Sequence, residues 1–200
     1  MRLFVKICGL STAAAVDAAV AAGADAVGFV FHAPSPRHVG PARAAALARR
    51  LPPQVQSVAV TLQATQTEVD RVLERFQPDA WQCDADDFLR LSLPAGVEPW
   101  AVVRGAAIVA VLPRRVVFDA RVSGRGLRAD WQCASVLARE RQLVLAGGLD
   151  AANVAAAIAR VQPFGVDVSS GVESEPGVKD PARIGAFAAA ARRAAEAIAA

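Results

Sequence analysis

Short apolar runs alternate with alanine-rich segments along almost the whole chain. Runs rich in Val, Ile and Phe predict eight strands, at 3–8, 26–31, 55–62, 79–83, 100–104, 115–119, 142–146 and 165–168. Segments with helical spacing predict six helices between or after them, at 12–22, 41–51, 66–76, 130–140, 150–161 and 181–199. Strands that alternate with helices indicate βαβ units, and strands that are apolar throughout indicate a parallel sheet covered on both faces.

Eight such units in 200 residues, without a linker or a change in composition, favour a closed barrel over an open sheet. The predicted fold is therefore α/β, a single (β/α)8 TIM barrel domain spanning residues 1–200. Two connections are short. The helix expected after the fourth strand covers only 85–92, and the segment GAAIVAVLPRR after the fifth strand leaves about ten residues for a crossover that normally needs that many or more. We therefore expect a shortened fifth βα unit.

The composition narrows the class of protein. The chain is 54% hydrophobic and 20% charged, which is enough apolar material for one large core. Its net charge is +3, but the basic residues are scattered and no basic cluster is interleaved with aromatic residues, so no nucleic-acid partner is expected. The N-terminus enters a strand directly, and no apolar run reaches the roughly 18 residues of a membrane span. A cytoplasmic protein that binds no membrane is expected, while monomer and homodimer both remain open.

The three cysteines, Cys8, Cys83 and Cys133, lie far apart in the sequence, and no CxxC motif is present. Neither a disulfide framework nor a zinc site is indicated, because metal ligands cluster at short spacings. His32 and His38 do not change this interpretation, so no metal is expected.

Chemistry in a (β/α)8 barrel lies at the carboxyl ends of the strands. Cys8 ends the first predicted strand, Arg37 follows the second, Asp119 ends the sixth and Asp167 lies in the eighth. Two of these residues also have a plainer interpretation. Arg37 in PSPRH would be a solvated loop arginine, and Asp119 would be a carboxylate that caps a helix or braces a loop.

Two glycine-containing loops follow the seventh and eighth strands, in AGGL at 146–149 and DVSSG at 167–171. Barrels commonly bind phosphate between these two loops, where backbone N–H groups converge on an anion. Simple turns would also explain the glycines, but their occurrence after these two strands favours a phosphate site. The candidate residues are Gly147, Gly148, Ser169, Ser170 and Gly171.

These motifs resemble one family. KICGL at 6–10, AGADAVGFVF at 22–31, SPR at 35–37, LAGGLDAANV at 145–154 and GVDVSSGVESEPGVKD at 165–180 match, in order and spacing, the motifs of phosphoribosylanthranilate isomerase of tryptophan biosynthesis. The match extends over nearly the whole chain, and the last motif is highly specific.

The resemblance implies an isomerase that acts on a small phosphoribosyl substrate by an Amadori rearrangement, without a cofactor. It places the general base at Cys8 and the general acid at Asp119. It also places the contact with the anthranilate group at Arg37, a second pocket carboxylate at Asp167, and the phosphate site on the glycine and serine loops. A thiolate base needs a lowered pKa. We expect Arg37 and the substrate iminium to supply it, because Lys6 is expected to point to the other side of its strand.

The chain also departs from the family's pattern. Gln82-Cys83-Asp84-Ala85 stands where the family usually has Gln-Leu-His-Gly, Thr61-Leu62-Gln63 stands at the end of the third strand, and Ser123-Gly124-Arg125-Gly126 replaces Gly-Gly-Thr-Gly. These changes leave two alternatives open. One is an isomerase of another phosphoribosyl amine, although that family usually builds its acid and base from two aspartates. The other is a non-catalytic phosphate-binding paralogue.

Overall fold

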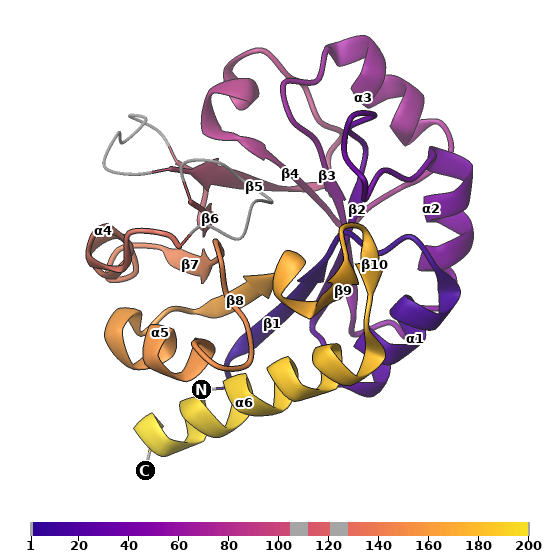
Figure 1. Ribbon diagram of the computed structural model, residues 1–200. Coiled ribbons are helices and arrows are strands. Elements are labelled where there is room, and N and C mark those ends of the chain that lie inside the picture. Colours follow the sequence, from indigo (N-terminus) through magenta and orange to yellow (C-terminus); the bar gives the residue numbers. More distant parts are fainter. Residues whose placement is uncertain (1, 105–111, 121–127, 200) are drawn as a thin grey trace.

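The computed structural model describes residues 2–104, 112–120 and 128–199. Its eight parallel strands follow one another around a closed barrel in chain order, and β8 pairs with β1 to close the ring (Figure 1). The predicted (β/α)8 fold is therefore confirmed. The strands are β1 (Phe4–Cys8), β2 (Ala26–Val30), β3 (Gln56–Val60), β4 (Ala80–Asp84), β5 (Glu98–Val103), β6 (Arg115–Phe118), β7 (Gln142–Leu145) and β8 (Gly165–Val168).

Helices cover the outside of this ring (Figure 1). They are α1 (Ala13–Ala21), α2 (Pro41–Ala48), α3 (Gln66–Leu73), α4 (Trp131–Leu137), α5 (Val154–Val161) and the long C-terminal α6 (Pro181–Ala199), with a 3₁₀ helix η1 (Ala85–Leu89) after β4. All six predicted helices form, and most are shorter than predicted. For α1, the Thr12 side chain accepts a hydrogen bond from the backbone N–H of Ala15, and Pro41 begins α2, as expected of helix starts.

The alternation of side chains along the strands separates two cores. Outward residues such as Val5 and Ile7 of β1 pack under the helices in the larger cluster. A smaller cluster, which includes Val58, Trp100 and Val144, fills the inside of the ring. Residues two apart on a strand share a face, so every second residue of β1 points into the barrel. This alternation determines which side chains reach the site.

The connection after β5 is short, as predicted. β5 ends at Val103 and β6 begins at Arg115. Most of this connection, 105–111, lies outside the described residues, as does 121–127, which includes Ser123, Gly124, Arg125 and Gly126.

One feature after β8 was not predicted. The 3₁₀ helix η2 (Ser170–Val172) leads into a small antiparallel hairpin of β9 (Glu173–Glu175) and β10 (Val178–Lys179). Strands of three and two residues are too short to give a periodic signal, so the sequence pattern could not reveal them. The hairpin matters because Glu173 and Lys179 lie against the site. Among the described residues, no helix has the length and apolar character needed to cross a membrane.

Candidate active site

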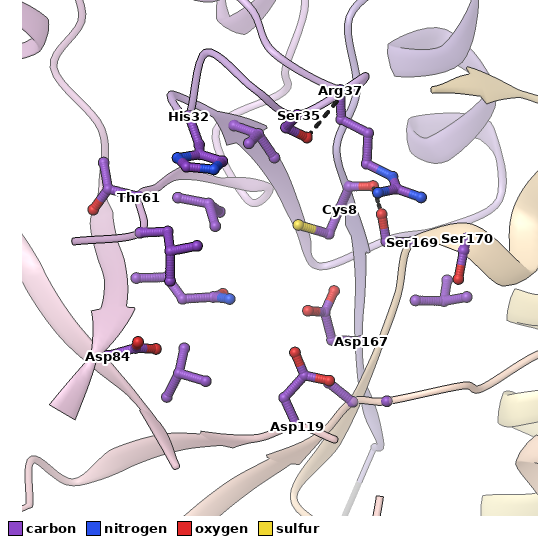
Figure 2. A pocket seen from close by; sticks show the side chains of 18 of the residues that line it. Cys8, His32, Ser35, Arg37, Thr61, Asp84, Asp119, Asp167, Ser169 and Ser170 are labelled. Carbon is purple, nitrogen blue, oxygen red and sulfur yellow. Dashed lines mark hydrogen bonds between the residues drawn. The ribbon is translucent and has the colours of Figure 1, made fainter. Parts of the chain in front are cut away.

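A cavity of about 200 Å³ opens at the carboxyl ends of the barrel strands. The residues that line it include most of those predicted from the sequence: Cys8, Arg37, Asp119, Gly147, Gly148, Asp167, Ser169 and Ser170. Figure 2 shows Cys8, Asp119 and Asp167 around one space, with His32, Thr61 and Asp84 across it. Gly171 is not among the lining residues. Within the described residues, no group of three or more His, Cys, Asp or Glu side chains is placed to hold a metal ion.

Lys6 is not where it was expected. Lys6 and Cys8 are two residues apart on β1 and therefore share its inner face, so the expectation that Lys6 points to the other side is wrong. The Lys6 ammonium is fully buried and lies 2.9 Å from Oδ2 of Asp167 on β8. Burial alone would lower the pKa of Lys6, but Asp167 and Cys8 outweigh burial and raise it.

Cys8 is 7% exposed, and both positive and negative groups act on its thiol. Burial raises the pKa of Cys8 overall; Lys6 and Lys179 oppose that rise, and Asp167 adds to it. The lowered pKa that was expected for Cys8 is therefore not found in the protein without its substrate. Burial likewise raises the pKa of the Asp167 carboxyl group, an effect that Lys6 opposes and Asp119 reinforces. Oδ1 of Asp167 is buried and accepts no hydrogen bond from the described part of the chain. It is therefore placed to receive a donor from a ligand.

Arg37 is held by the hairpin. Its Nε and Nη2 donate to the two carboxylate oxygens of Glu173 at 2.7 and 2.8 Å, and Lys179 donates to the same carboxylate at 2.6 Å. Glu173 and Lys179 are almost fully buried. Burial alone would raise the pKa of Glu173, but hydrogen bonds from Arg37 and Lys179 lower it overall. Arg37 is thus a fixed, buried cation at the cavity wall, and its interpretation as a solvated loop arginine is wrong.

Asp119 follows β6 directly and is half-buried. Its Oδ1 accepts a hydrogen bond of 2.7 Å from the backbone N–H of Ala120. The carboxyl group also acts electrostatically on Asp167. It lies near Asp167 at the cavity, with the thiol of Cys8 beyond (Figure 2).

The two predicted phosphate loops lie next to each other. Gly147 and Gly148 have φ values of 81° and 63°, which are left-handed conformations that glycine adopts without strain. Gly171 has a different reason to be glycine, because a Cβ atom there would lie 2.0 Å from the carbonyl oxygen of Leu149. The loops after β7 and β8 are therefore in direct backbone contact. The Ser169 hydroxyl also donates to the carbonyl oxygen of Cys8 at 3.1 Å, which ties the second loop to β1 (Figure 2).

The opposite wall contains described residues from two of the segments that depart from the family's pattern, 61–63 and 82–85. Asp84 forms an ion pair with Arg104 beside the cavity, and both side chains remain partly exposed. Thr61 accepts a hydrogen bond of 3.0 Å from the indole N–H of Trp81, and Gln82 lines the cavity with an Oε1 atom that has no partner in the described residues. The charge of the aspartate that stands in place of histidine is thus balanced by Arg104, which directly follows β5.

Three residues near the site were not identified as candidates from the sequence: Lys6, Glu173 and Lys179. The alternation along β1 could have indicated Lys6, because it shares a face with Cys8. The two hairpin residues lie in the recognised motif at 165–180 but gave no signal of their own.

Comparison with known proteins supports the resemblance. The family model described as N-(5'phosphoribosyl)anthranilate (PRA) isomerase matches residues 5–190. The chain belongs to this family. It is accordingly an isomerase, and the reaction of the family is a step of tryptophan biosynthesis.

Individual members of the phosphoribosylanthranilate isomerase family are similar over nearly their whole length. The N-(5'-phosphoribosyl)anthranilate isomerase of Dechloromonas aromatica is 42% identical, over 99% of this chain and 100% of the relative. The crystal structure of the Thermus thermophilus enzyme is 27% identical, with a TM-score of 0.81 over 94% of this chain and 98% of that one. A second family structure is a complex with reduced 1-(o-carboxyphenylamino)-1-deoxyribulose 5-phosphate. It is 31% identical, with a TM-score of 0.76 over 96% of this chain and 99% of that one.

Proposed function

We propose that the chain converts N-(5'-phosphoribosyl)anthranilate into 1-(2-carboxyphenylamino)-1-deoxyribulose 5-phosphate, with Cys8 as general base and Asp119 as general acid. The proposal rests on one observation: a thiol, a carboxyl group and two loops suited to phosphate binding line the same cavity (Figure 2). The family supports the same reaction, because one of its structures holds a reduced form of the product.

The substrate phosphate binds between the loops after β7 and β8. Gly147, Gly148, Ser169 and Ser170 line that part of the cavity and offer backbone N–H groups and hydroxyls. Gly171 contributes by letting the second loop approach Leu149 of the first. Phosphate bound here orients the ribose over the reacting side chains, which lowers the entropic cost of the reaction.

Asp119 begins the reaction. In its protonated form it donates a proton to the ribose ring oxygen, and the bond from C1′ to that oxygen breaks. The nitrogen lone pair forms a C1′=N double bond, so the product is an open-chain iminium ion. General acid catalysis of this kind contributes about 10²–10⁴-fold to the rate.

Cys8 carries out the next step. Its thiolate removes the C2′ proton, and the electrons of that C–H bond move through C1′ to neutralise the iminium nitrogen. The resulting enaminol loses its 2′-hydroxyl proton and gains one at C1′ to give the ketone. The proton on Cys8 balances the one lost by Asp119, and the nitrogen acts as electron sink, so the proposed reaction uses no cofactor.

Asp167 and Arg37 hold the substrate. The buried Oδ1 of Asp167 is suited to accept a hydrogen bond from a ribose hydroxyl. Two N–H groups of Arg37 are committed to Glu173, and its Nη1 has no partner among the described residues. This remaining edge of the guanidinium is suited to the anthranilate carboxylate.

Turnover of phosphoribosylanthranilate by the purified protein is the direct test, together with complementation of a tryptophan auxotroph that lacks this isomerase. We expect activity in both assays, and Cys8→Ser should be nearly inactive because a hydroxyl is far too weak a base at neutral pH. Cys133→Ser is the matched control and should keep normal kinetics, since Cys133 lies on α4 outside the cavity.

Two outcomes would contradict the proposal. Activity retained by Cys8→Ser would remove the thiol from the mechanism. Binding of phosphate esters without any turnover would favour the non-catalytic paralogue, and turnover of only another phosphoribosyl amine would favour an isomerase of different specificity.

A further inference from the structure

Lys6 lies beneath the cavity as a fully buried ammonium group. It is 0% exposed and does not line the cavity, whereas its neighbours Cys8 and Asp167 do. Lys6 and Asp167 are paired residues of the β1–β8 ladder, and their side chains meet at 2.9 Å on the inner face. A buried charge is costly unless an opposite charge lies beside it. Asp167 provides one such partner.

Cys8 provides a second. A Cβ atom placed on Gly28 of β2 would lie 2.8 Å from Sγ of Cys8 and 3.3 Å from Nζ of Lys6. The sulfur of Cys8 and the ammonium nitrogen of Lys6 thus both lie close to Gly28. A side chain at position 28 would occupy the space that these two atoms need. The positive charge of Lys6 also acts electrostatically on the Cys8 thiol and opposes the rise of its pKa. One ammonium group therefore acts on two acidic groups, the Asp167 carboxyl and the Cys8 thiol.

Other charged groups also face the thiol. Lys179 on β10 and Arg37 after β2 act on Cys8 electrostatically. Both of these cations, however, bind Glu173 directly. Asp119 on β6 acts on Asp167. Lys6, whose ammonium nitrogen lies with the Cys8 sulfur beside Gly28, binds Asp167 and not Glu173.

We propose that Lys6 is a positioning residue that favours the thiolate form of Cys8, and that Asp167 limits this effect by competing for the same ammonium group. The relevance to turnover rests on the proposed function, in which Cys8 is the base. The charge relation itself can be measured without any turnover.

The test measures how fast iodoacetamide alkylates Cys8 as a function of pH, by mass spectrometry of the Cys8 peptide. The midpoint of this profile reports the pKa of the thiol, since only the thiolate reacts. Lys6→Met should move the midpoint up, because a cation is lost, and Asp167→Asn should move it down, because the competing anion is lost. An opposite charge at this distance changes a midpoint by roughly 1–3 pH units.

The decisive comparison is between Asp167→Asn and the double variant Lys6→Met/Asp167→Asn. Both variants lack the Asp167 carboxylate, and they differ only in the Lys6 ammonium group. The double variant therefore has no unpaired buried carboxylate that could impair its folding. We expect its midpoint to lie roughly 1–3 pH units above that of Asp167→Asn. The Cys133 peptide serves as an internal control and should give the same midpoint in every variant, and circular dichroism checks the fold.

Equal alkylation midpoints of Cys8 in these two variants would overturn the proposal. The role of Lys6 would then be limited to its ion pair with Asp167, which links β1 to β8. In Lys6→Met, the acidic limb of the pH profile of kcat/KM should follow the alkylation midpoint upward, which a structural tie alone would not cause. If the midpoints move as expected but Cys8→Ser remains active, the charge relation stands and the proposed function fails. The two failures are thus distinguishable.

Discussion

Gly171→Ala tests whether the contact between two loops builds the phosphate site. The added Cβ atom would lie 2.0 Å from the carbonyl oxygen of Leu149 and 3.0 Å from its carbonyl carbon. Close carbon–oxygen contacts in proteins are about 3.3–3.6 Å, so the loops after β7 and β8 must separate by more than about 1 Å. Both loops line the cavity through Gly147, Gly148, Ser169 and Ser170. The substitution therefore widens the proposed phosphate site without changing any group that carries out chemistry.

A displacement of about 1 Å at a positioning site can lower the rate about 10²-fold. We expect Gly171→Ala to lower kcat/KM by that order, mainly through KM, and to weaken competitive inhibition by inorganic phosphate. Gly185→Ala on α6 is the matched control, because a Cβ atom there meets no atom within 4 Å. It should leave the kinetics unchanged and stabilise the protein by about 0.5–1 kcal/mol. If Gly171→Ala folds and keeps the KM and phosphate inhibition of the unmodified protein, the reasoning is refuted.

Three further predictions concern the acid, the anion and the hairpin. Asp119→Asn should lower kcat by at least about 10²–10⁴-fold while binding of a substrate analogue, measured by calorimetry, stays nearly unchanged, because an amide keeps the shape but cannot donate the proton. Sulfate soaked into crystals should bind between Gly147-Gly148 and Ser169–Gly171; an empty site there with sulfate bound elsewhere would count against the phosphate assignment. Glu173→Gln should lower the free energy of unfolding at pH 7 by about 3–5 kcal/mol, because it breaks buried ion pairs. The stabilising effect of the Glu173 carboxylate is present above the usual glutamate pKa of about 4.3 and is lost as the pH falls through the lower pKa of the folded protein. Denaturation of both proteins at pH 7 and in acid should therefore show that the difference in their free energies of unfolding shrinks in acid. A difference that stays constant would contradict the lowered pKa of Glu173.

The fold was predictable because its signal repeats. Each strand is a short apolar run and each helix an alanine-rich segment, so eight weak signals supported one architecture. Element ends were less accurate. The helix predicted at 130–140 forms only over Trp131–Leu137, since alanine and arginine favour a helix in sequence without fixing where tertiary packing ends it.

The candidate site was predictable where topology alone fixes a position. Residues at the carboxyl ends of barrel strands lie close to the mouth, and Cys8 and Asp119 both line the cavity there. The partners of these residues depend on side-chain contacts across the chain, which topology does not give. The bidentate pair of Arg37 with Glu173 joins residues 136 positions apart, and no local pattern in the sequence links them. The position of Lys6, by contrast, follows from the sequence, because residues two apart on β1 share a face and Lys6 therefore lies on the same side as Cys8.

Closure of the ring by β1 and β8 has a consequence for how the protein is made. Lys6 is synthesised before Asp167, its counter-ion, which lies 161 positions later in the chain. A nascent chain that has not yet released β8 from the ribosome cannot bury this lysine without leaving a charge uncompensated. Chains cut short before Asp167 therefore cannot seal the barrel, and they leave β1 and β7 as open sheet edges that proteases and chaperones can engage. The buried ammonium group thus gains its counter-ion only after β8 has been synthesised and has paired with β1.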